Sequence, residues 1–495
     1  MTLLGRKVLL ALLILTLPAV GIAADRFWLI GGGPSPQSAE AQIEFNVQWV
    51  RETLDRLAPD AQVHVFFANG DEGTPSVVEH LSEPDTAAMR FEALARVFGQ
   101  RDENRLRYRE HEVALAEGGT AADSLIPRLG RQLASLEPGE QGMIVYNGHG
   151  SWEADRSSNA LRLWGESRLD VRTFERLLSE VDPEVPIRFV FTQCFSGAFS
   201  RSVHPDAVPS MELAAGQRCG FFAESEDRLS EGCSASIEIG DYRDYTTYFF
   251  AALSGETRLG EPVESRDWDG DGRITPFDAH LHTIVEGRNA DLPRSTSEDF
   301  LERWQPWYLR WVETDELPDN VYGRAAAAIA RAAELPEDGR ALGAELDRRY
   351  AELAREIAGA EGEQGQLAAD ASAAQRRIQQ AVGQRWPHLL HPFTAGFDRT
   401  IQGDLPAITR FIEEHPEYGE LVGMEERDDR LTLELIELER DLSHLERLRR
   451  TRMLARALAQ IERHGSDGDR EVYARLRSCE ALPLTSGTAR AADGL

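Results

Sequence analysis

The sequence contains the stretch Val145-Tyr146-Asn147-Gly148-His149-Gly150-Ser151, in which an apolar run gives way to small residues around a histidine. A second stretch, Phe191-Thr192-Gln193-Cys194-Phe195-Ser196-Gly197, has the same form but carries a cysteine. The apolar residues at 142–147 and 187–192 are typical of strands buried on both faces. Because parallel sheets bind ligands at the carboxyl ends of their strands, we expect His149 and Cys194 to meet at one sheet edge.

The segments around these motifs continue an alternation of strands and helices. Apolar runs predict further strands at 26–31, 63–68 and 220–223. Periodic apolar residues predict helices at 39–57, 121–136, 171–181 and 242–253. This alternation predicts an α/β fold, with a mainly parallel sheet and helices on both of its faces.

A cysteine and a histidine at one site indicate nucleophilic catalysis. A free thiol has a pKa of about 8.5, so it needs a neighbouring imidazole to take up its proton. The same imidazole can then protonate a leaving amine. We therefore predict Cys194 as nucleophile and His149, 45 residues earlier, as general base. Gly148 and Gly150 are expected to let the backbone turn sharply, and the N–H groups of Gly150 and Cys194 to stabilise an oxyanion.

Both motifs resemble those of the caspase-like cysteine peptidases, the group of caspases, legumains, metacaspases and gingipains. These enzymes carry His-Gly after one strand and Cys after the next. The form Cys194-Phe195-Ser196-Gly197 is nearer to the Cys-x-Ser-Gly of legumains than to the Cys-x-Gly of caspases. The resemblance spans roughly residues 25–253. It implies a caspase-like fold in which His149 is the base, Cys194 the nucleophile and Gly150 part of the oxyanion hole.

The segment that follows the strand predicted at 220–223 is acidic. Glu224, Ser225, Glu226 and Asp227 lie where the resemblance implies part of the pocket for the P1 side chain. The carboxylates of Glu224, Glu226 and Asp227 are therefore candidates for binding a basic residue. The alternative is that they are solvated residues of a turn, and the P1 preference stays open.

Residues 267–278 fit the twelve-residue loop that binds Ca²⁺. Asp267, Asp269 and Asp271 occupy its positions 1, 3 and 5, and Arg273 offers its carbonyl at position 7. Asp278 closes the loop at position 12, where its shorter reach replaces that of Glu. We expect a structural Ca²⁺ here and no organic cofactor. The alternative is an acidic turn that binds the ion weakly or not at all.

Residues 1–24 have the basic start, apolar run and small residues of a signal peptide. We expect an exported protein, periplasmic or secreted, without stable membrane insertion after cleavage; an uncleaved anchor is the alternative. The formal net charge of −30 disfavours binding to nucleic acid.

The chain has only four cysteines, too few for a disulfide scaffold. An oxidising compartment still permits one bridge, and Cys219 with Cys233 is the natural local pair. That pairing would leave Cys194 and Cys479 free.

The chain from about residue 318 is rich in Ala, Glu, Arg and Leu. We predict a peptidase domain at 25–315, an α-helical domain at 316–481 and a disordered tail at 482–495. The helical domain is expected to be a long antiparallel hairpin or coiled coil, through which oligomers or protein partners bind. Its heptad seam consists of leucines spaced alternately by four and three: Leu431, Leu435, Leu438, Leu442 and Leu445.

Three functions remain open at this point. The first is an endopeptidase that acts on a peptide or protein substrate through an acyl-enzyme at Cys194. The second is a transpeptidase, because an amine can resolve the same acyl-enzyme. The third is a catalytically inactive scaffold that works through its C-terminal helices, although the presence of both His149 and Cys194 favours an enzyme.

Overall fold

The computed structural model describes residues 25–70, 73–83, 86–264, 266–307, 316–336 and 339–485. The predicted signal peptide at 1–24 lies outside the described residues, as do residues 486–495 of the predicted tail.

A mainly parallel sheet forms the centre of the protein, with strand order β10-β9-β8-β5-β1-β2. Only β10 in this order runs antiparallel to its neighbour. The strands β5 and β8, which precede the two motifs, are neighbours in the middle of the sheet. The strands are β1 Arg26–Gly32, β2 Gln62–Phe67, β5 Gly142–Ser151, β6 Ala160–Leu163, β7 Ser167–Asp170, β8 Ile187–Phe191, β9 Arg218–Phe222 and β10 Arg294–Ser295.

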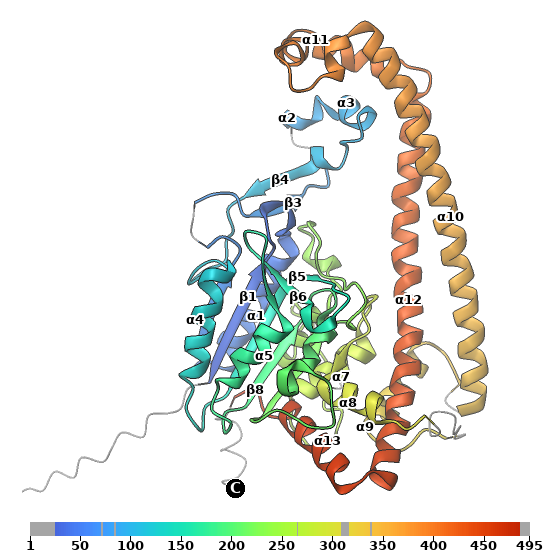
Figure 1. Ribbon diagram of the computed structural model, residues 1–495. Coiled ribbons are helices and arrows are strands. Elements are labelled where there is room, and N and C mark those ends of the chain that lie inside the picture. The colour runs from blue at the N-terminus through green and yellow to red at the C-terminus, as the bar shows by residue number, and fades with distance from the viewer. Residues whose placement is uncertain are drawn as a thin grey trace, which may run out of the picture.

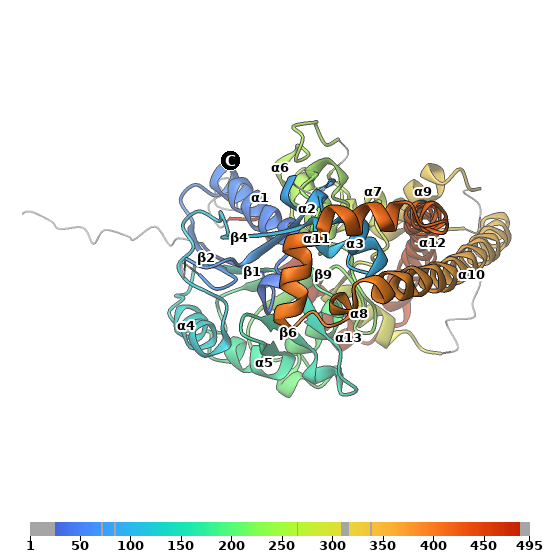
Figure 2. The same ribbon diagram turned by 90° about the horizontal axis from the view of Figure 1, so that it is seen from above.

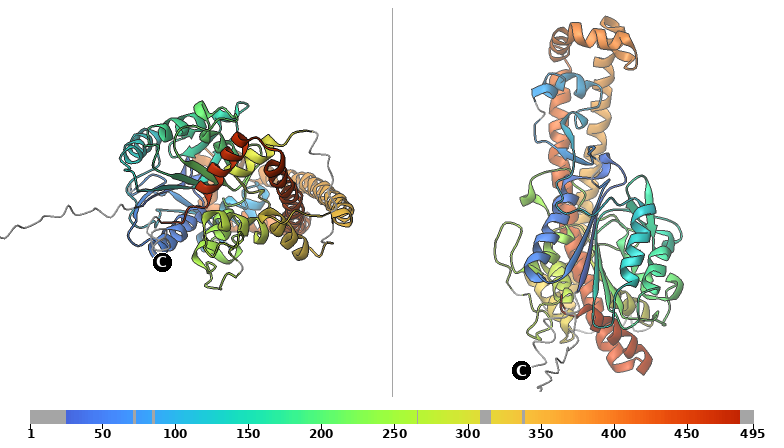
Figure 3. Two further views of the ribbon diagram at one scale, coloured as in Figure 1. Left: turned by 90° about the horizontal axis from the view of Figure 1, so that it is seen from below. Right: turned by 90° about the vertical axis from the view of Figure 1, so that its left-hand side faces the viewer.

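Helices cover both faces of the sheet (Figure 3). Helices α1 and α6 lie on one face, with α7 packed on α6, and α4 and α5 lie on the other. The predicted α/β fold is therefore confirmed. These helices are α1 Ala41–Leu57, α4 Ala122–Ala134, α5 Val171–Ser179, α6 Tyr245–Ser254 and α7 Pro276–Glu286, and the next helix along the chain is α8 Thr296–Trp304.

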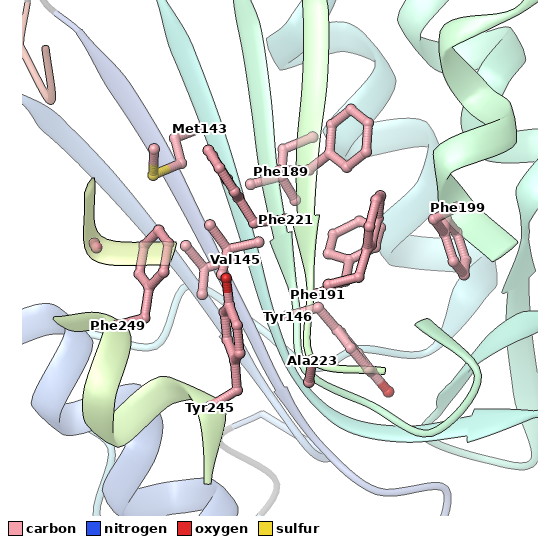
Figure 4. Close-up of a cluster of buried hydrophobic side chains, with 14 of the residues drawn as sticks. Met143, Val145, Tyr146, Phe189, Phe191, Phe199, Phe221, Ala223, Tyr245 and Phe249 are labelled. Carbon is pink, nitrogen blue, oxygen red and sulfur yellow. The ribbon is translucent and has the colours of Figure 1, made fainter. Parts of the chain in front are cut away.

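Side chains of the central strands alternate between two halves of the core (Figure 4). Val145 lies on the side of α6, near Phe249, whereas Tyr146 lies on the opposite side. There Tyr146 meets Phe191 edge to face, and Phe191 meets Phe199 in the same way. Burial of each such aromatic side chain stabilises the fold by roughly 1.5–3 kcal/mol. Packing on both faces thus holds the ends of β5 and β8 in place.

The C-terminal region forms the predicted antiparallel hairpin, which rises beyond the sheet (Figure 1). Its two arms are α10 Gly339–Arg385 and α12 Tyr418–His464, and α11 Ala395–Glu413 forms the tip. Leu431 and Leu435 of the predicted seam are buried in a small cluster with Ala360 of α10. The heptad pattern therefore reports contact between two helices of this chain.

The hairpin tip is tied to the sheet by an arm that leaves the region after β2 (Figures 1 and 2). The tip's core includes Ile378, Trp386 and Ile408, and Ala93 and Val97 of the arm join the same cluster. The arm consists of β3 Val77–His80, β4 Leu106–Arg109, α2 Thr86–Met89 and α3 Glu92–Val97.

Residues on both sides of the predicted boundary at 315/316 belong to one hydrophobic core. Tyr322 of α9 (Val321–Ala332), Leu448 of α12 and Leu476 of α13 (Asp467–Glu480) all join the core of the sheet domain. Buried Glu298 of α8 accepts a hydrogen bond from Arg450 of α12 at 2.8 Å. Burial alone raises the pKa of Glu298, but the nearby charges of His280 and Arg450 lower it to about 2.

The disulfide predicted between Cys219 and Cys233 is wrong. Cys219 of β9 is bonded instead to Cys479 of α13, 260 positions later, and Cys233 and Cys194 are free. Packing of α13 against β9 brings Cys479 to Cys219, and nothing local in the sequence signals that contact. The bridge joins the last helix to a strand of the central sheet.

Within the described residues, none of the helices combines the length and the apolar character that a membrane span needs.

Candidate active site

The two motif residues follow the paired ends of neighbouring parallel strands at the same distance along the chain. Tyr146 of β5 is paired with Phe191 of β8, and His149 and Cys194 each follow three residues later. Both therefore lie at the carboxyl edge of the sheet, in its middle. The strand residues before them are packed in the core, so the polar groups of His149 and Cys194 lie at the edge of the sheet.

The two glycines of the first motif have another role than the predicted sharp turn. Strand β5 continues through Gly148 and Gly150 to Ser151 and pairs there with β6. A Cβ atom on Gly150 would lie 2.0 Å from the carbonyl oxygen of Cys194, and one on Gly148 would lie 2.5 Å from that of Gly32. Glycine is required because the backbones approach closely, and at Gly150 the approach is to the backbone of Cys194.

The imidazole of His149 is held by groups that come from the start of α1. Its Nε2 lies 2.9 Å from a carboxylate oxygen of Glu40, and a further hydrogen bond joins the ring to the backbone of Ser38. Burial lowers the pKa of His149, but the bond and charge of Glu40 together with the Ser38 bond outweigh it and raise the pKa overall. An acidic residue that stabilises imidazolium is the third part of a catalytic triad.

Sequence reasoning missed Glu40 because it lies 109 residues before His149. It is the residue just before α1, where acidic side chains are common for reasons of helix capping alone. Its place beside the extension of β5 follows only from the pairing of β1 with β5.

The nucleophile candidate lies on a sharp turn. Phe195, the next residue, has a φ of 61°, in the left-handed region that non-glycine residues rarely adopt. The half-buried sulfur of Cys194 accepts a hydrogen bond from the N–H of Ser230 at 3.4 Å and donates to the carbonyl of Ser230 at 3.9 Å. Burial raises the pKa of the Cys194 thiol, the Ser230 backbone lowers it, and the carboxylates of Asp291 and Glu224 raise it again.

His149 and Cys194 share an edge but not a hydrogen bond among the described residues. The imidazole is bonded to Glu40 and Ser38, and the thiol to Ser230. Hydrogen bonds of catalytic residues often tighten only when substrate binds. In this arrangement the imidazole and the thiol are therefore each held by other partners.

The acidic segment after β9 divides into buried and exposed parts. The interpretation of all its acids as solvated turn residues is wrong for Glu224, which is fully buried and accepts hydrogen bonds from the N–H groups of Ser225 and Leu292. Glu226 forms an ion pair with Arg201 at 2.7 Å, and Asp227 is exposed and accepts from the Ser225 hydroxyl. Burial raises the pKa of Glu224.

Asp291 is a second buried acid near the nucleophile that sequence reasoning missed. It is fully buried, and one of its oxygens accepts from the N–H of Glu231 at 2.7 Å. Burial and the charge of Glu224 raise the pKa of Asp291 well above its usual range. Cations of this chain already lie beside both acids, since Arg228 pairs with Glu224 at 3.3 Å and the charge of Arg447 acts on Asp291.

The predicted calcium loop gathers three of its acids. Ligand oxygens of Asp267, Asp269 and Asp271 lie within 4.8 Å of one another, and Gly270 and Gly272 have φ values of 80° and 84°. These carboxylates fit the oxygen ligands that Ca²⁺ prefers.

The predicted loop ligand Asp278 is engaged elsewhere. It is buried in a capping box at the start of α7, where it accepts from Thr275 and from the N–H of Trp268. Asp278 therefore holds the backbone of the loop through hydrogen bonds. It does not belong to the acidic cluster, which contradicts its assignment as a ligand in this arrangement. Arg273 donates its N–H to Asp271, and the role of its carbonyl as a ligand stays a prediction.

Comparisons with known proteins add little to this picture. No protein-family model matches the sequence, and no curated protein matches it. Among solved structures, protein GSU0716 from Geobacter sulfurreducens is similar, with a TM-score of 0.33 and 11% sequence identity. That similarity covers 55% of this chain and 92% of the other.

Proposed function

We propose that this protein is an exported cysteine endopeptidase of the caspase-like type, with Cys194 as nucleophile and His149 as general base. One observation carries the proposal: the two residues each follow, by three positions, the last pair of neighbouring parallel strands, and a carboxylate holds the imidazole. A structural histidine and a structural cysteine need no such register.

The proposed reaction begins with rotation of the His149 imidazole toward the sulfur, where it takes the thiol proton. The thiolate attacks the peptide carbonyl carbon, and the charge that develops on oxygen is met by the N–H groups of Gly150 and Cys194. The C–N bond breaks as His149 returns the proton to the amine, and water then hydrolyses the thioester. Glu40 stabilises the imidazolium that forms between these steps.

The proposed substrate pocket lies on the side of Glu224 and Asp291. Both acids are fully buried with raised pKa values, and Glu224 already pairs with Arg228 at 3.3 Å, so a basic P1 side chain would meet only the more exposed acids of this segment. Ser225, Glu226 and Asp227 line a hollow of about 440 Å³, which Arg201, Arg294 and Arg303 line as well.

A thiol-reactive peptide probe with a basic P1 residue tests the enzyme proposal. The probe should label Cys194, and His149→Ala should slow labelling by roughly a hundredfold or more. The chain offers a matched control in His64 of β2, whose ring lies 2.8 Å from a carboxylate oxygen of Glu117. His64→Ala removes the same kind of pair and should leave the labelling rate unchanged.

The other possible results discriminate among the remaining functions. Equal and slow labelling of wild type and His149→Ala would refute the proposed enzyme activity and favour the function of an inactive scaffold. Cys233→Ser should retain labelling, and loss of labelling in Cys194→Ser alone identifies the sulfur. Product analysis with an added amine separates hydrolysis from transpeptidation.

We also propose that Asp267, Asp269 and Asp271 bind a structural Ca²⁺. Arg477 of α13 donates to Asp269 at 2.8 Å, so the loop already contacts the helix that the disulfide anchors. Binding would neutralise three acids held close together and so stabilise the folded chain.

A further inference from the structure

Residues 228–235 cross the carboxyl edge of the sheet from one strand end to the next, and we name this segment the strap. It begins at β8, where the carbonyl of Arg228 accepts from the N–H of Phe195 at 2.9 Å. It passes β5, where the Cys233 sulfur donates to the carbonyl of Gly148 at 3.7 Å. It ends beside α1, where Ser234 and Gln42 exchange two hydrogen bonds of 3.0 Å.

The strap engages the sulfur of Cys194 directly. Ser230 bonds this sulfur through both its N–H and its carbonyl, and its hydroxyl donates to the carbonyl of Thr192 at 2.7 Å. The thiol is therefore bonded to the backbone of the strap and not to His149. An attacked carbonyl carbon must come within roughly 3–3.5 Å of the sulfur, a position that Ser230 competes for.

Helix α12 fastens the strap from outside. Arg440 of α12 forms a two-pronged ion pair with Glu231, with N–O distances of 3.2 Å on both prongs. Glu446, two turns further along α12, accepts from Arg228 at 3.3 Å. The side chains of Arg440 and Glu231 are only 21% and 26% exposed, so solvent weakens this pair less than it weakens a fully exposed one.

We propose that the strap is an autoinhibitory element that keeps Cys194 latent, and that α12 controls its release through Arg440 and Glu231. This inference rests on the proposed function, because it names how the same nucleophile is regulated. It also gives the hairpin a role, because Arg440 lies on one of its two arms.

The test measures how fast iodoacetamide, a small neutral reagent, alkylates Cys194, followed by peptide mapping. Arg440→Glu places two acids side by side and should speed alkylation by at least about fivefold, the factor expected from loss of a pair worth about 1 kcal/mol. Glu231→Gln breaks the same pair from the strap side and should act in the same direction. The double variant Glu231→Arg/Arg440→Glu restores the pair and should return the rate to within about twofold of wild type.

The matched control is Arg427→Glu, because Arg427 of α12 also forms a pair with an acid, Glu363 of α10, at 2.9 Å. It should leave the Cys194 alkylation rate unchanged. Equal rates in wild type, Arg440→Glu and Glu231→Gln would overturn the proposal, and so would an equal increase in Arg427→Glu.

Peptide turnover, measured in parallel, separates this inference from the proposed function. Faster alkylation in Arg440→Glu without any peptide cleavage would support the strap and count against the peptidase. Peptide cleavage by wild type with alkylation rates equal in all variants would support the peptidase and refute the strap.

Discussion

The bridge between Cys219 and Cys479 makes a sharp prediction about stability. We expect Cys219→Ala/Cys479→Ala to unfold at much lower urea concentration than wild type. The bond closes a loop with a sequence separation of 260 residues, for which the chain-entropy relation gives about 5.6 kcal/mol at 25 °C. Measured effects of disulfide removal are often smaller, so the expected loss is about 2–5 kcal/mol.

Removal of the bridge should weaken the structure most at the contact between α13 and the sheet. Glu480, next to the bridge, is fully buried and accepts from the Thr296 hydroxyl at 2.8 Å and from the N–H of Ser297 at 2.7 Å. These bonds join the end of α13 to the start of α8, so fraying of α13 would leave buried polar groups without partners.

Urea unfolding followed by circular dichroism and by tryptophan fluorescence measures the effect. Wild type with a reductant should resemble the double alanine variant, and Cys233→Ala should change the free energy of unfolding by only about 1 kcal/mol. Peptide mapping without reduction should recover the Cys219–Cys479 bridge. Identical urea midpoints for oxidised and reduced wild type, or recovery of a Cys219–Cys233 bridge, would refute the assignment.

Three further predictions concern the core, the active site and the calcium loop. The pKa of Glu298 lies at about 2 against an ordinary 4.5, so its stabilisation is complete above pH 4.5 and is lost as the pH falls toward 2. Urea midpoints of Glu298→Gln should therefore vary less across that window than those of wild type. Gly150→Ala places a Cβ 2.0 Å from the carbonyl oxygen of Cys194 and should cost at least about 1–3 kcal/mol and abolish probe labelling. Gly343→Ala, with open space around it in α10, should be tolerated. Ca²⁺ should raise the melting temperature of wild type but not of Asp271→Asn, and equal shifts in both would contradict the proposed site.

Much of the fold could be predicted because strands buried on both faces leave a continuous apolar signal. The runs at 142–147 and 187–192 lie in β5 and β8, and the leucine seam marks the contact between α10 and α12. Both signals are local, since each depends on residues a few positions apart. The order of His149 and Cys194 after these strands was enough to bring them to one edge.

The parts that sequence could not supply depend on contacts between distant segments. Glu40 reaches His149 only because β1 pairs with β5, and Cys479 reaches Cys219 only because α13 packs on β9. The continuation of β5 past Gly148 depends on β6, a later strand. Asp278 shows a competition between two local patterns, in which the capping box satisfied the carboxylate before a metal site could use it.

The C-terminal helices belong to the architecture of the candidate active site. Arg447 of α12 is buried and donates to the backbone carbonyls of Asp291 at 2.8 Å and Gly287 at 2.6 Å. Asp291 in turn binds the N–H of Glu231 in the strap, which touches Cys194 through Ser230. A chain of contacts therefore runs from α12 to Cys194 in three steps. A chain truncated after residue 315 would lose the first of these steps and expose core surface now covered by α9 and α12. The lost contact and the exposed core have the same cause, because α12 both completes the core and positions the segments around Cys194.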